Sequence, residues 1–161
     1  MKQNTRHLTV AAAIAALYVV LTGLSALFGL DKGAIQFRIS EALTVLPCLT
    51  PAAIPGLFVG CLLSNLLYAA ALPDLIFGSL ATLLGAVGTY YLGRKVKWLS
   101  ALPPILSNTV IIPLVLKYAY GLEGGLLYFA VTVFVGEFVC CGLIGTLLLY
   151  HLPKPLLRYI K

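Results

Sequence analysis

Five side chains that can carry charge or form several hydrogen bonds lie within long apolar stretches of this chain, and Gln36 lies beside them. A charged group at the centre of a membrane-spanning helix costs about 2.5 kcal/mol or more, so such groups mark functional positions. Carboxylates accept hydrogen bonds, guanidinium groups donate them and side-chain amides do both. The candidate site residues are therefore Arg38, Glu41, Asn65, Asn108 and Glu137.

Glu137 is the acid that lies deepest in an apolar stretch. It follows residue 126, where that stretch begins, by 11 positions, which places it near mid-membrane at 1.5 Å per residue. No lysine or arginine lies within one helical turn of it. Two interpretations remain open: a protonated carboxyl group bonded to a neighbouring helix, or a ligand contact or proton site, which is our hypothesis.

Asn108 and Asn65 each have two interpretations as well. A single asparagine within a membrane helix often joins neighbouring helices through its amide. The same amide can donate to and accept from a ligand. Tyr68 follows Asn65 by about one turn and is a candidate ligand contact beside it.

Arg38 and Glu41 are three residues apart, so on a helix they share one face and can pair. The pair is either a structural ion pair near the outer interface or a clamp over a binding site. In the second interpretation Gln36 and Phe37 are arranged above it.

The composition of the chain indicates the class of protein that positions these groups. Its 161 residues are 61% apolar and only 10% charged, and the mean hydropathy is +1.02. A soluble domain carries about 25% charged residues, so a soluble enzyme and a nucleic-acid-binding module are not expected. The sequence holds no Ser/His/Asp set, Walker loop or metal-ligand cluster. We therefore predict a membrane protein that is not an enzyme and has no cofactor and no metal site.

The apolar stretches predict a single all-α domain, residues 1–161, folded as a compact bundle of six transmembrane helices. About 20 apolar residues cross a bilayer, and Pro47 and Pro51 make the second span short. Small residues recur every four positions at Gly56, Gly60 and Ser64, which is typical of close helix contact. The predicted spans are 8–30, 35–47, 52–71, 75–92, 100–117 and 126–150.

Basic residues fall in alternate gaps between these spans. Six spans place both termini on one side, and the segments on that side hold eight of the eleven lysines and arginines: Lys2, Arg6, Arg94, Lys95, Lys97, Lys154, Arg158 and Lys161. Basic loops are retained in the cytoplasm. The chain is therefore predicted to be a multi-pass protein of the cell membrane, in contact with the lipid bilayer, with both termini cytoplasmic. A net charge of +6 distributed in this way does not indicate a nucleic-acid partner.

The first span carries a flat face of small side chains formed by Ala11, Ala12, Ala15 and Ala16. Such a face either packs inside the bundle or docks on another membrane protein, because lipid packs poorly against it. A further set of aromatic residues is read mostly as anchors at the membrane interface: Tyr18, Tyr90, Tyr91, Trp98 and Tyr159. The four cysteines are read as small apolar packing residues.

Several segments of the chain resemble the QueT family of membrane proteins. The most specific is 33–47 (GAIQFRISEALTVLP), followed by 50–58 (TPAAIPGLF), 60–65 (GCLLSN) and 74–84 (DLIFGSLATLL). Leu102-Pro-Pro104 with Asn108, and Gly136 with Glu137, complete the pattern. Six short spans, the alanine face and the absence of a nucleotide-binding loop agree with this resemblance, which covers nearly the whole chain.

The resemblance implies the substrate-binding subunit, or S component, of an energy-coupling factor (ECF) transporter for queuosine precursors. It implies a 7-deazaguanine substrate and an ECF module, made of a transmembrane coupling protein and two ATPases, that docks on the alanine face. A carboxylate can accept two adjacent donors of such a base, which suits Glu137. Asn108 and Asn65 suit its other polar edges, and one or more of five aromatic residues would stack on the ring: Phe37, Tyr68, Phe77, Tyr118 and Tyr128.

Three alternatives stay open at this stage. The chain can be an S component for another vitamin-like solute. It can be a proton-coupled carrier of a small solute that uses Glu137. It can also be a membrane scaffold without a ligand.

Overall fold

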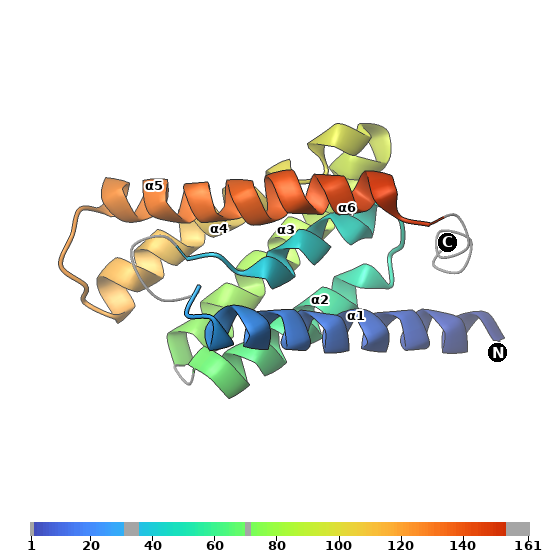
Figure 1. Cartoon of the computed structure of the whole chain (residues 1–161), viewed down its shortest axis with the longest axis horizontal. Helices are drawn as coiled ribbons and strands as arrows, with labels where there is room; N and C mark the ends of the chain where they lie inside the picture. The colour runs from blue at the N-terminus through green and yellow to red at the C-terminus, as the bar shows by residue number, and fades with distance from the viewer. Residues whose placement is uncertain (1, 31–35, 70–71, 154–161) are drawn as a thin grey trace.

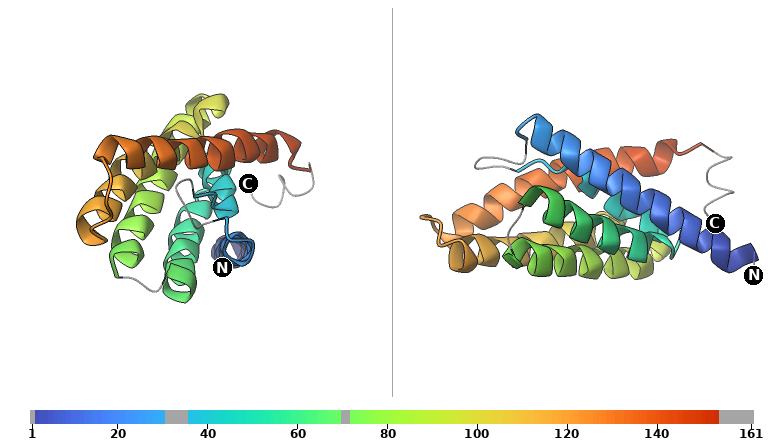
Figure 2. Two further views of the ribbon diagram at one scale, coloured as in Figure 1. Left: turned by 60° about the vertical axis from the view of Figure 1, so that its left-hand side comes forward. Right: turned by 90° about the horizontal axis from the view of Figure 1, so that it is seen from below.

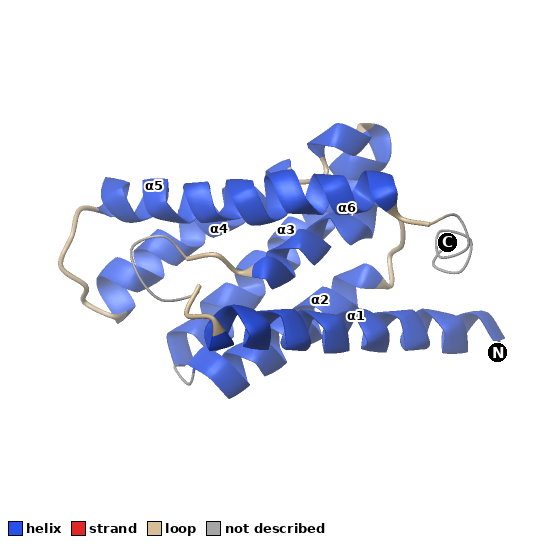
Figure 3. Ribbon diagram, in the orientation of Figure 1, coloured by secondary structure: helices blue, strands red, loops and turns tan. Residues whose placement is uncertain are grey.

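The computed structural model describes residues 2–30, 36–69 and 72–153, and every regular element in these ranges is a helix (Figure 3). The all-α prediction is confirmed. Some of the sequence-based expectations fall on residues outside the described ranges: the start of the second span at residue 35, the end of the third span at residues 70–71, and the basic residues Lys154, Arg158 and Lys161 with Tyr159.

Six helical segments follow one another in the described ranges. The first is α1 (Lys2–Leu27), and the second is a 3-10 helix, η1 (Ile39–Cys48). Each of the other four combines α-helical and π-helical turns, and a 3-10 turn, η4 (Lys97–Leu99), precedes the fifth. These four are α2 (Ala53–Ser64) with η2 (Asn65–Ala69), η3 (Asp74–Gly78) with α3 (Ser79–Lys95), α4 (Leu102–Leu114) with η5 (Val115–Ala119), and α5 (Leu126–Glu137) with η6 (Phe138–Gly145) and α6 (Thr146–His151).

Four of the six segments are long and apolar enough to cross a membrane. The other two, η1 and Ala53–Tyr68, are shorter apolar helices. A 3-10 helix rises about 2.0 Å per residue, so η1 extends about 20 Å, less than the hydrocarbon core of about 30 Å. The prediction of six spanning helices is thus confirmed by length and composition for four: Asn4–Leu27, Asp74–Lys95, Lys97–Ala119 and Leu126–His151.

The end of α1 differs from the predicted boundary at residue 30. Gly29 adopts a φ of 66°, and its N–H donates to Ala26 O at 3.1 Å. The next residue, Leu30, donates to Ser25 O at 2.9 Å. These two bonds and the left-handed glycine form a Schellman motif, which ends the helix at Leu27.

The segments lie side by side and alternate in direction (Figures 1 and 2). In Figure 1 the described chain begins and ends at the right, where the η1–α2 and α3–α4 connections also lie. The connection between η5 and α5 lies at the left. This arrangement agrees with the predicted order of alternating passes.

Buried residues make η1 the centre of the bundle. All of its residues from Ser40 to Cys48 are buried, and it packs against α1, α3 and η6. A 3-10 helix of this length is uncommon. It carries Glu41 into the middle of the protein.

Glycines let α2 approach α1 closely. A Cβ on Gly56 would lie 2.7 Å from the backbone oxygen of Ala11, and a Cβ on Gly60 would lie 3.1 Å from Cα of Ala15. The predicted small-residue seam is therefore confirmed as a helix contact. A Cβ on Gly60 would also lie 2.8 Å from Cβ of Tyr18, so the same contact places Tyr18 against the core.

Tyr120, just beyond η5, donates a hydrogen bond to the carboxylate of Asp74 at the start of η3. Partial burial and this hydrogen bond raise the pKa of Tyr120 to about 12. The hydroxyl therefore stays protonated at physiological pH. The bond joins the fourth and fifth helical segments at the end of the bundle opposite to Lys2 (Figure 1).

Candidate functional site

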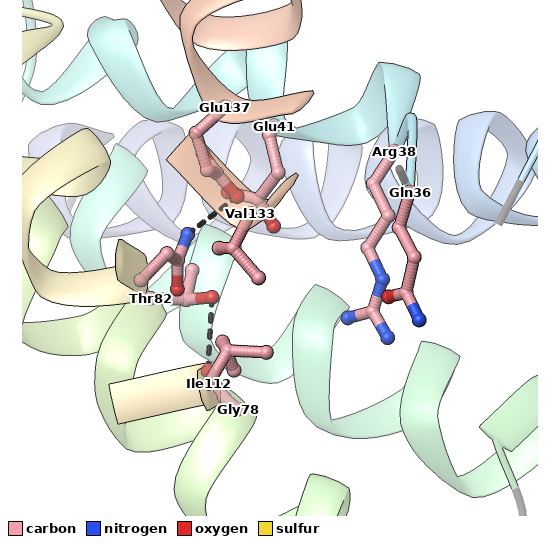
Figure 4. A pocket seen from close by; sticks show the side chains of 9 residues that line it. Gln36, Arg38, Glu41, Gly78, Thr82, Ile112, Val133 and Glu137 are labelled. Carbon is pink, nitrogen blue, oxygen red and sulfur yellow. Dashed lines mark hydrogen bonds between the residues drawn. The ribbon is translucent and has the colours of Figure 1, made fainter. Parts of the chain in front are cut away.

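A small internal cavity lies between η1, α3, α4 and α5. Its volume is about 30 Å³, which is room for water but not for a larger solute. Figure 4 shows Glu41 and Glu137 extending into it, with Arg38 and Gln36 projecting together on another side. The lining residues are Gln36, Arg38, Glu41, Gly78, Thr82, Asn108, Ile112, Val133 and Glu137.

Glu137 is the last residue of α5, at the point where the helix continues as the π-helical segment η6. Its Oε1 accepts a hydrogen bond of 2.8 Å from Nδ2 of Asn108, and Asn108 is only 3% exposed. The other oxygen, Oε2, is buried and has no hydrogen-bond partner among the described residues. A buried oxygen without a partner costs free energy, so this atom is available to a donor that enters the cavity.

Glu41 supplies a second carboxyl group from η1. It is 3% exposed, and its Oε1 accepts a hydrogen bond from the hydroxyl of Tyr18. Its Oε2 is buried and, as in Glu137, accepts no hydrogen bond from the part of the chain that the structure describes. Two acids thus contribute one free oxygen each to the same cavity.

Tyr18 is a site residue that the sequence-based interpretation assigned wrongly. It was expected at the membrane interface, but it is 1% exposed and holds Glu41 in place. The signal that could have found it is its spacing. Ala11, Ala15 and Tyr18 recur at the 4 and 3 residue intervals of one buried helix face.

The expected ion pair between Arg38 and Glu41 does not form, although both side chains are described. Arg38 precedes η1 with extended backbone (φ −97°, ψ 97°), so the two residues do not share a helix face. The Arg38 guanidinium lies 3.5 Å from Oδ1 of Asn65 instead. Both residues nevertheless line the same cavity.

Asn65 connects elements rather than lining the cavity. Its Nδ2 donates to the backbone oxygen of Asp74 at 2.8 Å, across the turn between η2 and η3. The same group lies 3.5 Å from Sγ of Cys61. The asparagine therefore touches the cavity lining through its contact with Arg38.

Gln36 approaches the helix that carries Glu137. A Cβ on Gly136 would lie 2.2 Å from the backbone oxygen of Gln36, closer than any side chain permits. Gly136 thus allows the segment 36–38 to lie directly on α5. This contact positions Gln36 and Arg38 beside the cavity (Figure 4).

Comparison with known proteins assigns the family. A family model described as QueT transporter matches residues 8–154. The chain belongs to the QueT transporter family. This match confirms the family that the sequence motifs indicated.

One curated relative of this QueT family member is the protein "Queuosine precursor transporter QueT" of Lactococcus lactis subsp. cremoris (strain MG1363). The two are 38% identical over 82 residues, which cover 51% of this chain and 48% of the relative. The chain thus spans about half the length of the curated relative it matches. No solved structure matches the chain.

Other cavity residues of this QueT family member were missed by the sequence-based interpretation. The hydroxyl of Thr82 donates to the backbone oxygen of Gly78 at 3.1 Å and lies 3.3 Å from Sγ of Cys61. Ile112 and Val133 complete the wall with apolar atoms. These two give no signal in sequence, because an apolar residue inside an apolar stretch has no contrast with its neighbours.

None of the five aromatic candidates lines the described cavity. Phe37 is half-buried, and its backbone N–H bonds Leu30 O at 2.8 Å. Tyr68 is 45% exposed and packs on α1, where a Cβ on Gly23 would lie 2.6 Å from its hydroxyl. The other three, Phe77, Tyr118 and Tyr128, are exposed.

The four alanines of α1 do not form one face in this QueT family member. Ala15 is 8% exposed, and both it and Ala11 pack against α2. Ala12 and Ala16 are exposed, because adjacent residues on an α-helix point about 100° apart. Ala15 is therefore buried inside the bundle, whereas docking on the partly exposed Ala11 and on the exposed Ala12 and Ala16 stays a prediction.

Proposed function

We propose that this protein is the S component of an ECF-type transporter, which captures a queuosine precursor outside the cell for ATP-driven import. The observation that carries the proposal is the pair of buried carboxyl oxygens, on Glu41 and Glu137, that face one internal cavity without partners. The name of the Lactococcus lactis relative agrees with the proposed substrate.

The polar groups at the cavity suit a 7-deazaguanine. Such a base presents a ring N–H beside an exocyclic amine, and a carboxylate accepts both. Glu137 has the free oxygen for this role, and the side-chain amide of Asn108 beside it can bond another polar edge. Arg38 and Gln36 supply donors for the carbonyl group of the base.

The cavity widens when a base binds, because about 30 Å³ holds only water. The segment 36–38 is the part of the wall that is not held within a helix. A flat ring needs apolar contact, and Ile112 and Val133 provide it at this site. Phe37, which adjoins two lining residues, remains the aromatic candidate next to the wall.

Both termini are cytoplasmic in this proposal. Arg94 and Lys95 end α3, and Lys97 follows them, at the same end of the bundle as Lys2 (Figure 1). Cytoplasmic loops carry an excess of lysine and arginine. The protein then resides in the cell membrane as a multi-pass subunit, and the substrate enters from the opposite end.

The energy for import comes from partners in this proposal. The sequence has no nucleotide-binding loop, so two ATPases and a transmembrane coupling protein act in trans. Ala12 and Ala16 are exposed small residues of α1, and the coupling protein docks on them. Small side chains allow helices to approach closely within a bilayer.

A calorimetric screen of the purified protein tests the substrate. The panel holds 7-deazaguanines, guanine, thiamin, riboflavin and biotin, and we expect a response to the 7-deazaguanines. A response to a vitamin alone would contradict the proposed substrate, but the proposal that the protein is an S component would still hold.

The second candidate is a proton-coupled carrier, which the free oxygen of buried Glu137 favours. Uptake into proteoliposomes separates the two functions. Uptake that requires the ATPases supports the S component. Uptake that a proton gradient drives without them supports the carrier.

A further inference from the structure

A second, larger pocket lies at the end of the bundle where the η1–α2 and α3–α4 connections come together (Figure 1). Its volume is about 520 Å³, against about 30 Å³ for the internal cavity. Leu49 and Pro51, between η1 and α2, give it apolar atoms, while α3 and η4 contribute Tyr90, Arg94 and Lys97. The pocket therefore combines an apolar wall with a hydroxyl group and two cations.

Aromatic rings hold both cations at this pocket. The guanidinium carbon of Arg94 lies 4.9 Å from the centre of the Tyr90 ring, and Nη1 donates to the Tyr90 hydroxyl at 2.7 Å. Nζ of Lys97 lies 4.7 Å from the centre of the Tyr150 ring. Cations are attracted to ring faces in this way, and each keeps further N–H groups that can donate to a ligand.

The chain has no acid near these cations in sequence. Segments 42–73, 75–122 and 138–161 contain neither aspartate nor glutamate, and all the residues that line the pocket fall within the first two. Glu41 and Glu137 line the internal cavity, and Asp74 bonds Tyr120 at the opposite end of the bundle. A negative charge at the pocket therefore has to come from a ligand.

The depth of the pocket indicates where this ligand is found. The candidate span Asp74–Lys95 ends at the pocket, and the next one, Lys97–Ala119, begins there. The ends of spans lie where the hydrocarbon core meets the lipid headgroups. Tyr91 and Trp98 are 67% and 68% exposed at this level, as is typical of aromatic residues at a membrane interface.

We propose that this pocket binds the headgroup of an anionic phospholipid. Arg94 and Lys97 donate to the phosphate, which accepts well from both kinds of cation, and the glycerol end of the lipid contacts Leu49 and Pro51. A zwitterionic headgroup also brings an ammonium group, for which these segments offer no carboxylate. Free phosphate shares the anionic chemistry, but it makes no use of the apolar wall. The inference does not rest on the proposed substrate.

Fluorescence of Trp98 tests the proposal, because it is the single tryptophan of the chain, follows Lys97 and is exposed. Phospholipids with brominated acyl chains quench a tryptophan that they contact. Brominated phosphatidylglycerol or brominated phosphatidylcholine is titrated into phosphatidylcholine vesicles that contain the protein. We expect the wild type to prefer phosphatidylglycerol about tenfold, and Arg94→Gln and Lys97→Gln each to lower this preference about fivefold.

Lys95→Gln is the matched control. Lys95 carries the same charge between the two cations and is exposed, but it does not line the pocket. Its loss is expected to change the preference by less than about twofold. An equal loss in Lys95→Gln and Arg94→Gln would show that a diffuse surface charge attracts the lipid, and it would overturn the proposed pocket.

Two measurements on the wild type decide the question without any variant. Excess inorganic phosphate at constant ionic strength is expected to leave the preference for phosphatidylglycerol unchanged, and its disappearance would assign the pocket to free phosphate. Equal binding of the two lipids overturns the proposal. Binding of poly-glutamate in that case would assign the pocket to an acidic protein segment. The transporter function proposed above is unaffected by either result.

Discussion

The backbone oxygen of Gln36 lies directly on Gly136, so close that a Cβ at that glycine would stand 2.2 Å from it. The contact joins the segment that enters η1 to the residue immediately before Glu137. Gln36 lines the cavity from one side, and Glu137 lines it from another. The contact between Gln36 and Gly136 therefore sets the width of the space between these two side chains.

Gly136→Ala is expected to weaken ligand binding at least tenfold while the helix content is retained. The added methyl group forces the 36–38 segment off α5, and overpacking of this kind costs about 1–3 kcal/mol. Circular dichroism and titration calorimetry provide the two readouts. Gly142→Ala is the matched control, because a Cβ there meets its nearest atom at an ordinary 3.4 Å, and unchanged affinity is expected for it. Equal affinities of the two variants would show that the Gln36 contact does not shape the site.

Tyr18→Phe is expected to lower the free energy of unfolding by about 1–3 kcal/mol, because it removes the hydrogen bond that buried Glu41 accepts from Tyr18 and leaves both carboxyl oxygens without a donor among the described residues. Thermal unfolding in detergent measures the change. Tyr91→Phe serves as the control, since Tyr91 is 67% exposed and is expected to tolerate the loss of its hydroxyl. If both variants unfold at the wild-type temperature, the Tyr18–Glu41 bond contributes nothing to stability.

The groups at the site were predictable where they contrast with their surroundings. Glu137 and Asn108 stand out as polar residues in apolar stretches, and they lie 2.8 Å apart in the fold. Tyr18 has no such contrast, because tyrosine is an amphipathic residue that also anchors spans at the membrane interface, and its position in the middle of the first span was not weighed. Ile112 could not be predicted either, because it is an apolar residue in an apolar stretch. Only the packing of α4 against its neighbours places it at the cavity.

Backbone geometry also limited the prediction. The Arg38–Glu41 pair assumed that an α-helix includes both residues, but Arg38 is extended and the helix that follows is 3-10. The prediction of one alanine face assumed that the four alanines of α1 lie on the same side of the helix. In the fold Ala15 packs closely on Gly60 of α2, whereas Ala16 is exposed. This difference depends on how the two helices pack, which the sequence pattern does not contain.

Ala16→Trp is expected to block co-purification with the ECF module and to leave ligand binding within threefold of the wild type. Ala16 is exposed, so the indole obstructs a partner without entering the bundle. Ala15→Trp is the contrasting variant, because Ala15 packs on Gly60, and its large side chain is expected to destabilise the α1–α2 contact itself. Normal assembly of Ala16→Trp would remove the exposed alanines from the proposed docking surface.

The measurement that tests the central claim most directly is the affinity of the wild type and Glu137→Gln for a 7-deazaguanine, by titration calorimetry on purified protein. Glutamine keeps the size of the side chain but places an amide donor where the base also donates. We expect the wild type to bind and Glu137→Gln to bind at least tenfold more weakly, which is ~1.4 kcal/mol. Glu123→Gln, a change at an exposed acid before α5, is expected to leave the affinity unchanged. Equal affinities of wild type and folded Glu137→Gln, or no binding by the wild type, would contradict the account.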